Sequence, residues 1–239
     1  MVLSKLRRRT LKARDKGNDL SDALMTVRSP TGPSAEAYRA LRTNLLYAYV
    51  DSSPRVIVVT SPGRGDGKTT TCANLGVALS QVNSNVLIVD CDLRQPTMHK
   101  VFALRNVYGL VNVLVGEYDL QEACHEPLPG LKVLTAGPVP PAPTELLSSQ
   151  QFAEFVERAR RQFEYVLIDV PPFQLVSDPI VVARLGDGAL LVLDAQKTRK
   201  VTVRQGVRNL EAVGAKVLGT VMNNTKVPRR TYHDHVYGG

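Results

Sequence analysis

Cysteine is scarce in this chain of 239 residues, and no apolar run is long enough to cross a bilayer. Crossing as a helix takes roughly 20 apolar residues. The three cysteines are odd in number and widely separated, a pattern that predicts neither a disulfide framework nor a zinc site. The first residues, Met-Val-Leu-Ser, lack both the apolar core of a signal peptide and the glycine needed for myristoylation. We therefore expect a cytoplasmic chain whose cysteines are reduced.

Acidic residues are fewer than basic ones: 22 Asp and Glu stand against 30 Lys and Arg, which gives a net charge of +8. Part of this excess is concentrated in an N-terminal arm that precedes any apolar periodicity. The basic residues of the arm are Lys5, Arg7, Arg8, Arg9, Lys12, Arg14 and Lys16. Each such residue near an anionic leaflet contributes about 1 kcal/mol of attraction. We expect the arm either to bind an anionic membrane surface reversibly or to act only as a solubilising tail, and nucleic acid is not the partner we expect.

A glycine-rich turn follows the apolar segment Arg55–Thr60 and ends in Gly67-Lys68-Thr69. In a phosphate-binding loop, backbone N–H groups surround the β-phosphate, the lysine reaches the β- and γ-oxygens, and the next hydroxyl joins the Mg²⁺ shell. The strict motif has glycine where this chain has Pro62, but the Lys-Thr pair is intact and helical spacing follows it. The residues expected to bind nucleotide are Gly63, Arg64, Gly65, Asp66, Gly67, Lys68, Thr69 and Thr70.

Nearly continuous apolar runs recur along the chain and alternate with segments of helical spacing. We predict strands at 55–60, 86–90, 131–136, 165–170, 189–195 and 217–222. We predict helices at 35–49, 68–81, 149–163, 179–185 and 201–213. Runs buried on both faces are typical of parallel sheets, so the pattern predicts an α/β fold with a doubly wound, predominantly parallel sheet and helices on both faces, the P-loop NTPase fold. The predicted division is a flexible basic arm at 1–34, one domain at 35–225 and a flexible tail at 226–239.

Carboxylates follow two of the predicted strands. Asp90 and Asp92 end the second strand, with Arg94 next in the alternation, so that in an extended chain all three would face one side. Asp169 ends the strand at 165–170 and is followed by two prolines. Phosphoryl transfer needs a metal to neutralise the phosphate oxygens, a carboxylate to orient or deprotonate the attacking hydroxyl, and cations at the transition state. The sequence therefore predicts ATP and Mg²⁺ chemistry at these strand ends.

Taken together, these motifs resemble the cytoplasmic kinase domain of bacterial P-loop tyrosine kinases, a family tied to capsule and exopolysaccharide production. The resemblance covers about Ser34 to Asn224. The matching pieces are Glu36-Ala-Tyr-Arg39-Ala-Leu-Arg42, the loop ending Gly67-Lys68-Thr69, Asp90-Cys-Asp92-Leu-Arg94, Gly137-Pro-Val-Pro-Pro-Ala-Pro-Thr-Glu-Leu-Leu147 and Leu167-Ile-Asp169-Val-Pro-Pro172.

The resemblance implies a role for each matching residue. Lys68 and Thr69 would bind the phosphates and Mg²⁺, and Asp169 would be the Walker-B residue. Asp90 and Asp92 would share metal positioning and activation of the tyrosine hydroxyl, so the metal set is Thr69, Asp90 and Asp169. Asn223, after the last predicted strand, is either an adenine contact or a residue of the turn that ends the strand.

The resemblance also implies partners. Glu36, Arg39 and Arg42 recur every three residues, which places them on one face of a helix. They would form a homo-oligomer contact, or a solvated helix face with the same spacing. One subunit would offer Tyr232 and Tyr237 to the next, whereas the family usually carries a denser tyrosine cluster. A separate membrane activator, a polysaccharide co-polymerase, would hold the chain at the inner face of the cell membrane.

Two other functions compete with the kinase. A P-loop ATPase of the septum-placement and chromosome-partition type would use ATP to switch dimerisation, but such proteins carry a further lysine early in the loop, where this chain has Gly63 beside Arg64. A nucleotide-dependent scaffold for polysaccharide assembly, with little turnover, would fit the short tyrosine tail.

Overall fold

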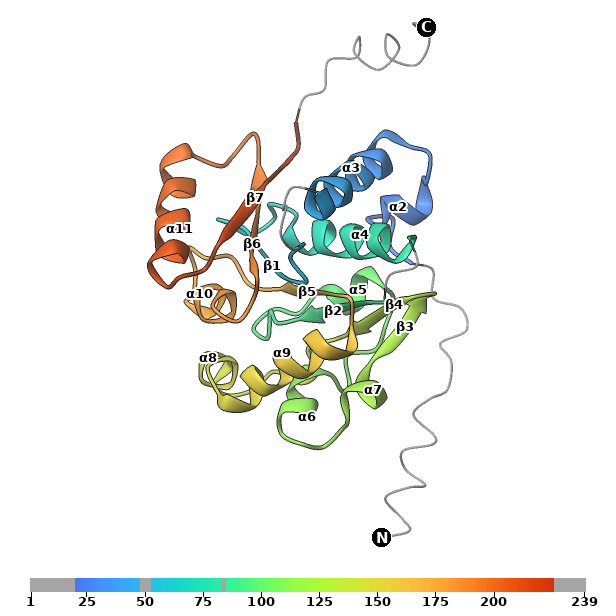
Figure 1. The fold of residues 1–239 in the computed structure, drawn as a ribbon, viewed down its shortest axis with the longest axis vertical. Helices are drawn as coiled ribbons and strands as arrows, with labels where there is room; N and C mark the ends of the chain where they lie inside the picture. Colours follow the sequence, from blue (N-terminus) through green and yellow to red (C-terminus); the bar gives the residue numbers. More distant parts are fainter. Residues whose placement is uncertain (1–19, 48–52, 83–84, 226–239) are drawn as a thin grey trace, which may run out of the picture.

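A seven-stranded sheet organises the chain in the computed structural model, which describes residues 20–47, 53–82 and 85–225 (Figure 1). The strand order is β3-β4-β2-β5-β1-β6-β7. The strands are β1 (Val56–Thr60), β2 (Val86–Asp90), β3 (His125–Leu128), β4 (Leu131–Leu134), β5 (Tyr165–Asp169), β6 (Gly188–Asp194) and β7 (Val217–Asn223). Neighbouring strands are parallel except β3 and β4, which form an antiparallel edge. The predicted doubly wound α/β fold is confirmed.

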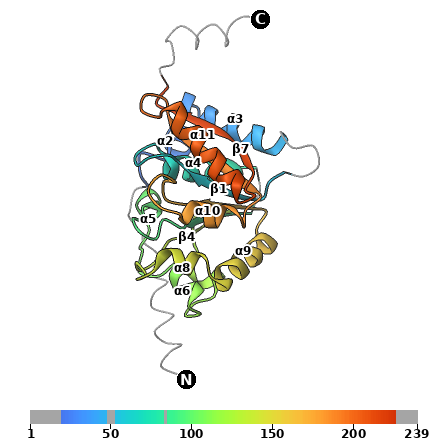
Figure 2. The same cartoon turned by 90° about the vertical axis from the view of Figure 1, so that its left-hand side faces the viewer.

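Helices cover both faces of the sheet (Figures 1 and 2). One layer holds α2 (Met25–Arg28), α3 (Pro33–Tyr47), α4 (Lys68–Ser80) and α5 (Met98–Val101). The other holds α6 (Leu110–Leu114), α7 (Leu120–Ala123), α8 (Pro143–Leu147), α9 (Gln150–Gln162), α10 (Asp178–Ala183) and α11 (Lys200–Ala212).

The alternation of side chains along the strands explains these layers. In β1, Val56 and Val58 pack into the core beneath α9, whereas Ile57 and Val59 pack into the core beneath α4. All five residues of β1 are buried, as are those of β2 and β5. Strands buried on both faces need no polar side chains until they end, so the polar residues gather at the strand ends.

The structure differs from the predicted division at the N-terminal side. Leu24 is fully buried, and the backbone N–H and hydroxyl of Thr26 donate to Asn74 Oδ1 of α4 at 3.0 and 2.9 Å. Residues 20–34 therefore belong to the folded layer, because these contacts attach α2 to α4. Residues 1–19 and the tail at 226–239, with both predicted acceptor tyrosines, lie outside the described residues.

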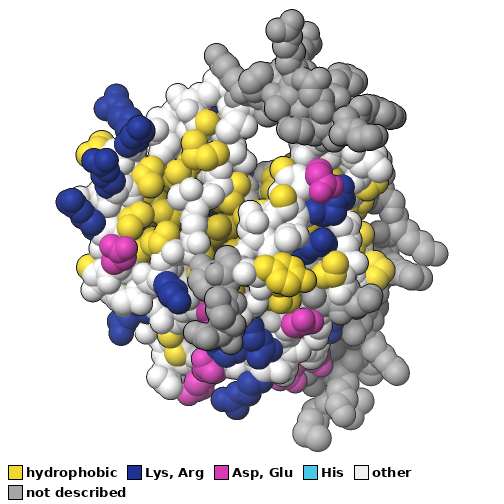
Figure 3. Space-filling model, turned by 45° about the horizontal axis from the view of Figure 1, so that its top comes forward, with side chains coloured by type: hydrophobic (Ala, Val, Ile, Leu, Met, Phe, Trp, Pro, Cys, Tyr) yellow, Lys and Arg dark blue, Asp and Glu magenta, His cyan; other side chains and the backbone are white. Residues whose placement is uncertain are grey.

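The outer side of α11 is basic. In Figure 3, Lys and Arg side chains line the outer edge of α11, and hydrophobic side chains gather just inside it. Lys200, Arg204 and Arg208 recur every four residues along this helix and are exposed. Among the residues that the structure describes, no helix combines the length and the apolar character needed to span a bilayer.

Candidate functional site

Three neighbouring strands end side by side at the carboxyl edge of the sheet. The pairing places Val59 of β1 opposite Asp169 of β5, and Asp169 opposite Asp90 of β2. The loop after β1 therefore begins next to Asp169, with Asp90 one strand farther along the same edge. This edge is where ligands bind in open parallel α/β sheets.

The loop between β1 and α4 has the backbone of a phosphate cradle. Gly65 and Gly67 have φ angles of +77° and +92°, which L side chains rarely adopt. Asp66 braces the turn, since its Oδ2 accepts from the backbone N–H of Gly63 at 2.7 Å. Helix α4 begins at Lys68, so its unpaired N–H groups and positive dipole end face the loop opening.

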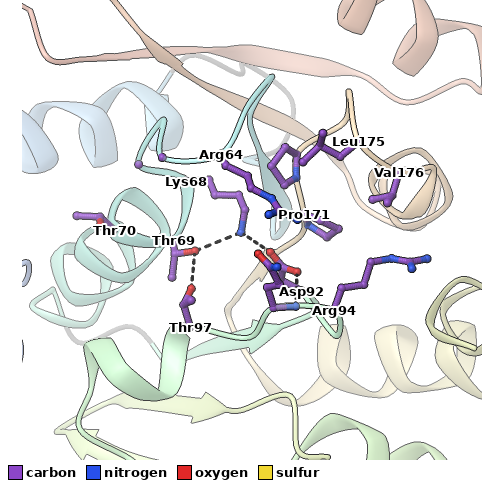
Figure 4. Close-up of a pocket in the computed structure, with 14 residues that line it drawn as sticks. Arg64, Lys68, Thr69, Thr70, Asp92, Arg94, Thr97, Pro171, Leu175 and Val176 are labelled. Carbon is purple, nitrogen blue, oxygen red and sulfur yellow. Dashed lines mark hydrogen bonds and ion pairs between the residues drawn. The ribbon is translucent and has the colours of Figure 1, made fainter. Parts of the chain in front are cut away.

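Lys68 lies between two carboxylates, Asp92 and Asp169. Figure 4 shows its ammonium between the Thr69 hydroxyl and Asp92. Its Nζ is 3.0 Å from Asp92 Oδ2 and 3.4 Å from Asp169 Oδ1. The hydroxyl of Thr69 donates to Asp169 Oδ2 at 2.6 Å, and the hydroxyl of Thr97 lies 3.3 Å from that of Thr69. The Lys68 side chain is only 11% exposed. Four of the predicted residues, Lys68, Thr69, Asp92 and Asp169, thus form one cluster of contacts.

Asp90 has a different position from Asp92. It is fully buried, and its two oxygens accept from the backbone N–H groups of Asp92, Thr97 and Met98 at 3.0–3.2 Å. The expectation that Asp90, Asp92 and Arg94 face one side is wrong, because β2 ends at Asp90 and the chain turns at Leu93 and Arg94. The turn sends Arg94 away from Lys68 (Figure 4).

The electrostatics follow from this burial. Burial alone would lower the pKa of Lys68, but the charges of Asp169 and Asp92 raise it above its ordinary value, so the ammonium stays protonated. Burial raises the pKa of Asp169, opposed by Lys68 and by the Thr69 hydroxyl. Burial and then the charge of Asp169 raise the pKa of Asp90 to about 8. The lysine therefore neutralises carboxylates that the interior alone would disfavour as anions.

A cavity of about 360 Å³ opens over this cluster. Six predicted nucleotide-binding residues line it: Arg64, Gly65, Gly67, Lys68, Thr69 and Thr70. Its other lining residues are Asp92, Arg94, Gln95, Thr97, Pro171, Pro172, Leu175 and Val176. Thr97 and the apolar wall were not predicted. The prolines after Asp169 could have indicated a wall, whereas Leu175 and Val176 carry no signal in the sequence.

Asn223 lies behind the loop. Its Nδ2 donates to the backbone oxygen of Asp66 at 2.8 Å and lies 3.4 Å from Thr71 Oγ1. A Cβ on Gly67 would meet Asn223 Nδ2 at 2.2 Å, so a glycine is required there for space as well as for its φ angle. Asn223 is not among the residues that line the cavity. An adenine contact by Asn223 stays a prediction.

The predicted oligomer face is partly used within the chain. Arg39 bonds Glu36 Oε2 at 2.8 Å and the backbone oxygen of Pro30 at 2.8 Å. Arg42 donates to the backbone oxygen of Ala78 at 2.8 Å, which attaches α3 to the end of α4. The Glu36 side chain is 63% exposed and that of Arg39 is 28% exposed, and Arg42 is half-buried as well, so Glu36 is the exposed member of the face.

The donor set fits a hard divalent cation. Mg²⁺ prefers carboxylate and hydroxyl oxygens and usually completes its shell with phosphates and water. The Thr69 hydroxyl and the Asp169 carboxylate are in direct contact, and Asp92 lies 3.0 Å from the Lys68 ammonium that also contacts Asp169. The ammonium already occupies a cation position between these oxygens, which shows that the cluster is arranged to receive positive charge.

Comparison with known proteins agrees with this geometry. The model of a family described as AAA domain matches residues 54–183. The tyrosine-protein kinase YwqD of Bacillus subtilis is 34% identical over 226 residues, 94% of this chain and 95% of that protein. The tyrosine-protein kinase Wzc of Salmonella typhimurium is 32% identical over 216 residues, which are 90% of this chain but 30% of that protein.

Solved structures separate the kinase from its ATPase rival. The kinase domain of the Escherichia coli tyrosine kinase ETK superposes with a TM-score of 0.84 and 30% identity, covering 92% of this chain and 86% of that one. The cell division ATPase MinD of Pyrococcus furiosus reaches a TM-score of 0.61 with 29% identity, covering 70% of this chain and 71% of that one. The kinase resemblance therefore fits better over more of the chain. Through its AAA domain and these relatives, the chain belongs to the bacterial tyrosine-protein kinases.

Proposed function

We propose that this protein transfers the γ-phosphate of ATP to protein tyrosines, its own tail included, and that this activity regulates capsule or exopolysaccharide synthesis. The observation that carries the proposal is the contact of Lys68 with Asp92 and Asp169 beneath a glycine cradle, with Thr69 bonded to Asp169. Phosphoryl transfer depends on positioning and on charge stabilisation, and this cluster supplies a fixed cation, carboxylates and a hydroxyl.

The phosphate loop and the residues next to it would bind ATP and Mg²⁺. Backbone N–H groups of the cradle would bind the β-phosphate, and Lys68 would turn from its carboxylates to the β- and γ-oxygens. Thr69 and Asp169 would hold Mg²⁺, with Asp90 beneath them, and the ion would supply charge neutralisation at those oxygens. Arg64, which lines the cavity, adds a second cation.

Asp92 is the carboxylate we expect to act on the acceptor tyrosine. Asp92 lines the cavity, whereas both oxygens of Asp90 are bonded to backbone N–H groups. We assign proton acceptance from the tyrosine hydroxyl to Asp92, and support of the loop after β2 to Asp90. In the step itself, the bond from the phenolic oxygen to the γ-phosphorus forms, the bond from that phosphorus to the β–γ bridging oxygen breaks, ADP leaves and the hydroxyl proton passes to Asp92.

Mixed-chain labelling tests the function. A Lys68→Met chain is incubated with Mg-ATP and an active chain whose own acceptors are removed by Tyr232→Phe and Tyr237→Phe. We expect intact-mass spectrometry to find phosphate on the Lys68→Met chain, and none when either chain is incubated alone. Mass spectrometry of its digested peptides should place that phosphate on Tyr232 or Tyr237. Addition of a candidate membrane activator should raise the yield. Absence of label on both chains, with activator present, would favour the scaffold function instead.

We also propose that the chain self-associates through the α3 face that carries Glu36, Arg39 and Arg42. Arg39→Ala together with Arg42→Ala should reduce transfer between chains about tenfold, the loss typical of an important interface residue. The single variants separate the causes. Arg42→Ala should cost about 1 kcal/mol of unfolding free energy, because it removes the bond to Ala78. Arg39→Ala should lower association in sedimentation velocity with a smaller loss of stability, because its bonds to Glu36 and Pro30 are exposed to solvent. Unchanged association would remove this contact from the proposal.

A separate membrane activator is part of the proposal. The chain matches nearly all of YwqD but less than a third of Wzc, so one relative carries a long additional region that the other lacks. We propose that a second protein supplies here what that region supplies in Wzc, and that it brings the chain to the inner face of the membrane.

The basic arm gives a direct test of membrane attachment. Deleting Met1–Lys16 should weaken binding to vesicles that contain anionic lipid by at least about 100-fold at low salt, because seven charges are lost at about 1 kcal/mol each. The difference should shrink as salt screens the charges. The matched control replaces Lys200, Arg204 and Arg208 of α11 with glutamine and keeps the arm, and it should lose less. Equal binding by the deleted and full chains would leave the arm as a solubilising tail.

A further inference from the structure

The cavity has a second end, away from the phosphate loop, that the proposed chemistry does not use. Arg94 lines this end, and its side chain points away from Lys68 (Figure 4). The Arg94 side chain is 40% exposed. Pro171, Pro172 and Leu175 line the cavity as well, and Leu175 is 53% exposed. The cavity therefore has an apolar wall over the Lys68 and Asp92 cluster and an accessible cation, Arg94, farther from the phosphate loop.

Two neighbouring helices hold the Arg94 guanidinium in place. Its Nε donates to Asp178 Oδ2 at 2.9 Å, and its Nη2 donates to Thr144 Oγ1 at 2.8 Å. The Thr144 hydroxyl in turn donates to Asp178 Oδ1 at 2.5 Å. Asp178 is fully buried at the first turn of α10, and Thr144 lies on α8. The arrangement ties the loop after β2 to both helices that flank the apolar wall.

One nitrogen of the guanidinium is left over. Within the described part of the chain, Nη1 of Arg94 has no hydrogen-bond partner, whereas Nε and Nη2 are both used. An arginine anchored through two nitrogens loses little further freedom when the third binds a ligand, and its preferred ligands are carboxylates and phosphates. The phosphate positions are already provided by the loop and Lys68 at the other end of the cavity.

We propose that Arg94 selects the acceptor: the tyrosine ring rests against the wall formed by Pro171, Pro172 and Leu175, and Nη1 binds a carboxylate two residues after the tyrosine. In an extended peptide, residues two apart project to the same side. The tail of this chain contains one such pair, Tyr232 and Asp234, whereas Tyr237 is followed by two glycines. This selectivity rests on the proposed kinase function and names the acceptor class of the same site, a tyrosine with an acidic residue at the second position after it.

The test compares acceptors and enzymes in pairs, with full chains throughout. The acceptors are Lys68→Met chains with or without Asp234→Asn, and the enzymes carry Tyr232→Phe and Tyr237→Phe with or without Arg94→Gln. For the enzyme that retains Arg94, we expect Asp234→Asn to raise the KM for the acceptor and to lower kcat/KM at Tyr232 about tenfold, the effect of one charged hydrogen bond. For the Arg94→Gln enzyme, the two acceptors should differ less than twofold.

Two further variants keep the result specific. Arg94→Lys should also lose the discrimination, since an ammonium cannot bond Asp178, Thr144 and a ligand with the same planar geometry. Arg184→Gln removes an exposed arginine just after α10 that does not line the cavity, and it should keep the tenfold difference.

The outcomes that overturn the selectivity differ from those that overturn the kinase. For the enzyme that retains Arg94, equal kcat/KM values for the acceptors with and without Asp234→Asn would overturn the proposed selectivity. This comparison leaves the enzyme's cavity unchanged. An Arg94→Gln enzyme that still discriminates tenfold would overturn it as well. No transfer to either acceptor by any enzyme would overturn the proposed function, and the selectivity with it.

Discussion

Replacing Lys68 with methionine is expected to lower the rate of tyrosine phosphorylation about a thousandfold, the upper range for loss of one preorganised charge at a transition state. The methionine keeps the apolar stem of the side chain and removes the ammonium that contacts Asp92 and Asp169. The measurement is the initial rate of phosphate incorporation at saturating Mg-ATP. Lys100→Met is the matched control, since Lys100 is exposed on α5 outside the cavity, and it should retain full rate.

The same substitution should change how stability depends on pH. Burial raises the pKa of the Asp169 carboxyl in the folded protein even with Lys68 present. Above the pKa that Asp169 has in the unfolded chain, the folded state therefore becomes less stable as pH rises, because it must ionise a carboxyl that it binds as an anion less well. Without Lys68 this pKa rises further. The methionine variant should therefore lose about 3 kcal/mol of unfolding free energy at pH 8 and less at pH 5. A loss that grows on acidification would contradict the role of Lys68 as the neutralising partner.

Asp169→Asn is expected to lower the phosphorylation rate about 100- to 1,000-fold, by the magnitude seen when one electrostatic group of an active site is removed. Asparagine keeps the shape and can still accept from the Thr69 hydroxyl, but it removes the charge that would hold Mg²⁺. Raising the Mg²⁺ concentration should not restore the rate.

Nucleotide binding separates this charge effect from damage to the fold. In the absence of Mg²⁺, the Asp169→Asn chain should bind ATP at least as tightly as the unchanged protein, because a carboxylate that repels the phosphates is gone. Asp22→Asn, at an exposed residue 3.6 Å from Arg28, is the control and should behave like the unchanged chain. Full activity of Asp169→Asn across a Mg²⁺ titration would transfer the metal role to another carboxylate.

The central sheet was predictable because its strands are buried on both faces. Strand β1, for example, contains an uninterrupted apolar run, Val56 to Val59, of the kind that is buried in a sheet with helices on both faces. The edge strand β3, at His125–Leu128, was missed, because it contains a proline and is mostly half-buried, so it shows no such run. Helices of four or five residues, such as α5 and α6, were missed for a related reason: they span little more than one helical turn, whereas a helical pattern is recognised over roughly 11 to 18 residues.

The site was predictable in composition but not in arrangement. Strand-end positions indicated that Asp90, Asp92 and Asp169 would gather, since parallel strands end at one edge. Only the turn after Asp92 determines that Asp92 contacts Lys68 while Asp90 bonds to the backbone beneath it. Local bonds from the backbone at Asp92, Gln95, Thr97 and Met98 to Asp90 and Asp92 hold that turn. The contact of Asp92 with Lys68 and the attachment of Arg94 to α10 join distant segments, and residue spacing does not encode them.

The contact between Asn223 and the phosphate loop has a kinetic consequence for the tail that follows it. Asn223 Nδ2 is 2.8 Å from the backbone oxygen of Asp66, and Tyr232 comes nine positions later. Nine residues span at most about 32 Å even when fully extended. The length of the chain therefore limits how far Tyr232 can lie from its own phosphate loop, and under the proposed transfer between subunits a neighbour's cavity would receive it only when the two subunits are held within that reach. Reaction order then reports on assembly: transfer between free chains is second order in protein, and transfer inside a formed assembly is first order, because the tether replaces diffusion.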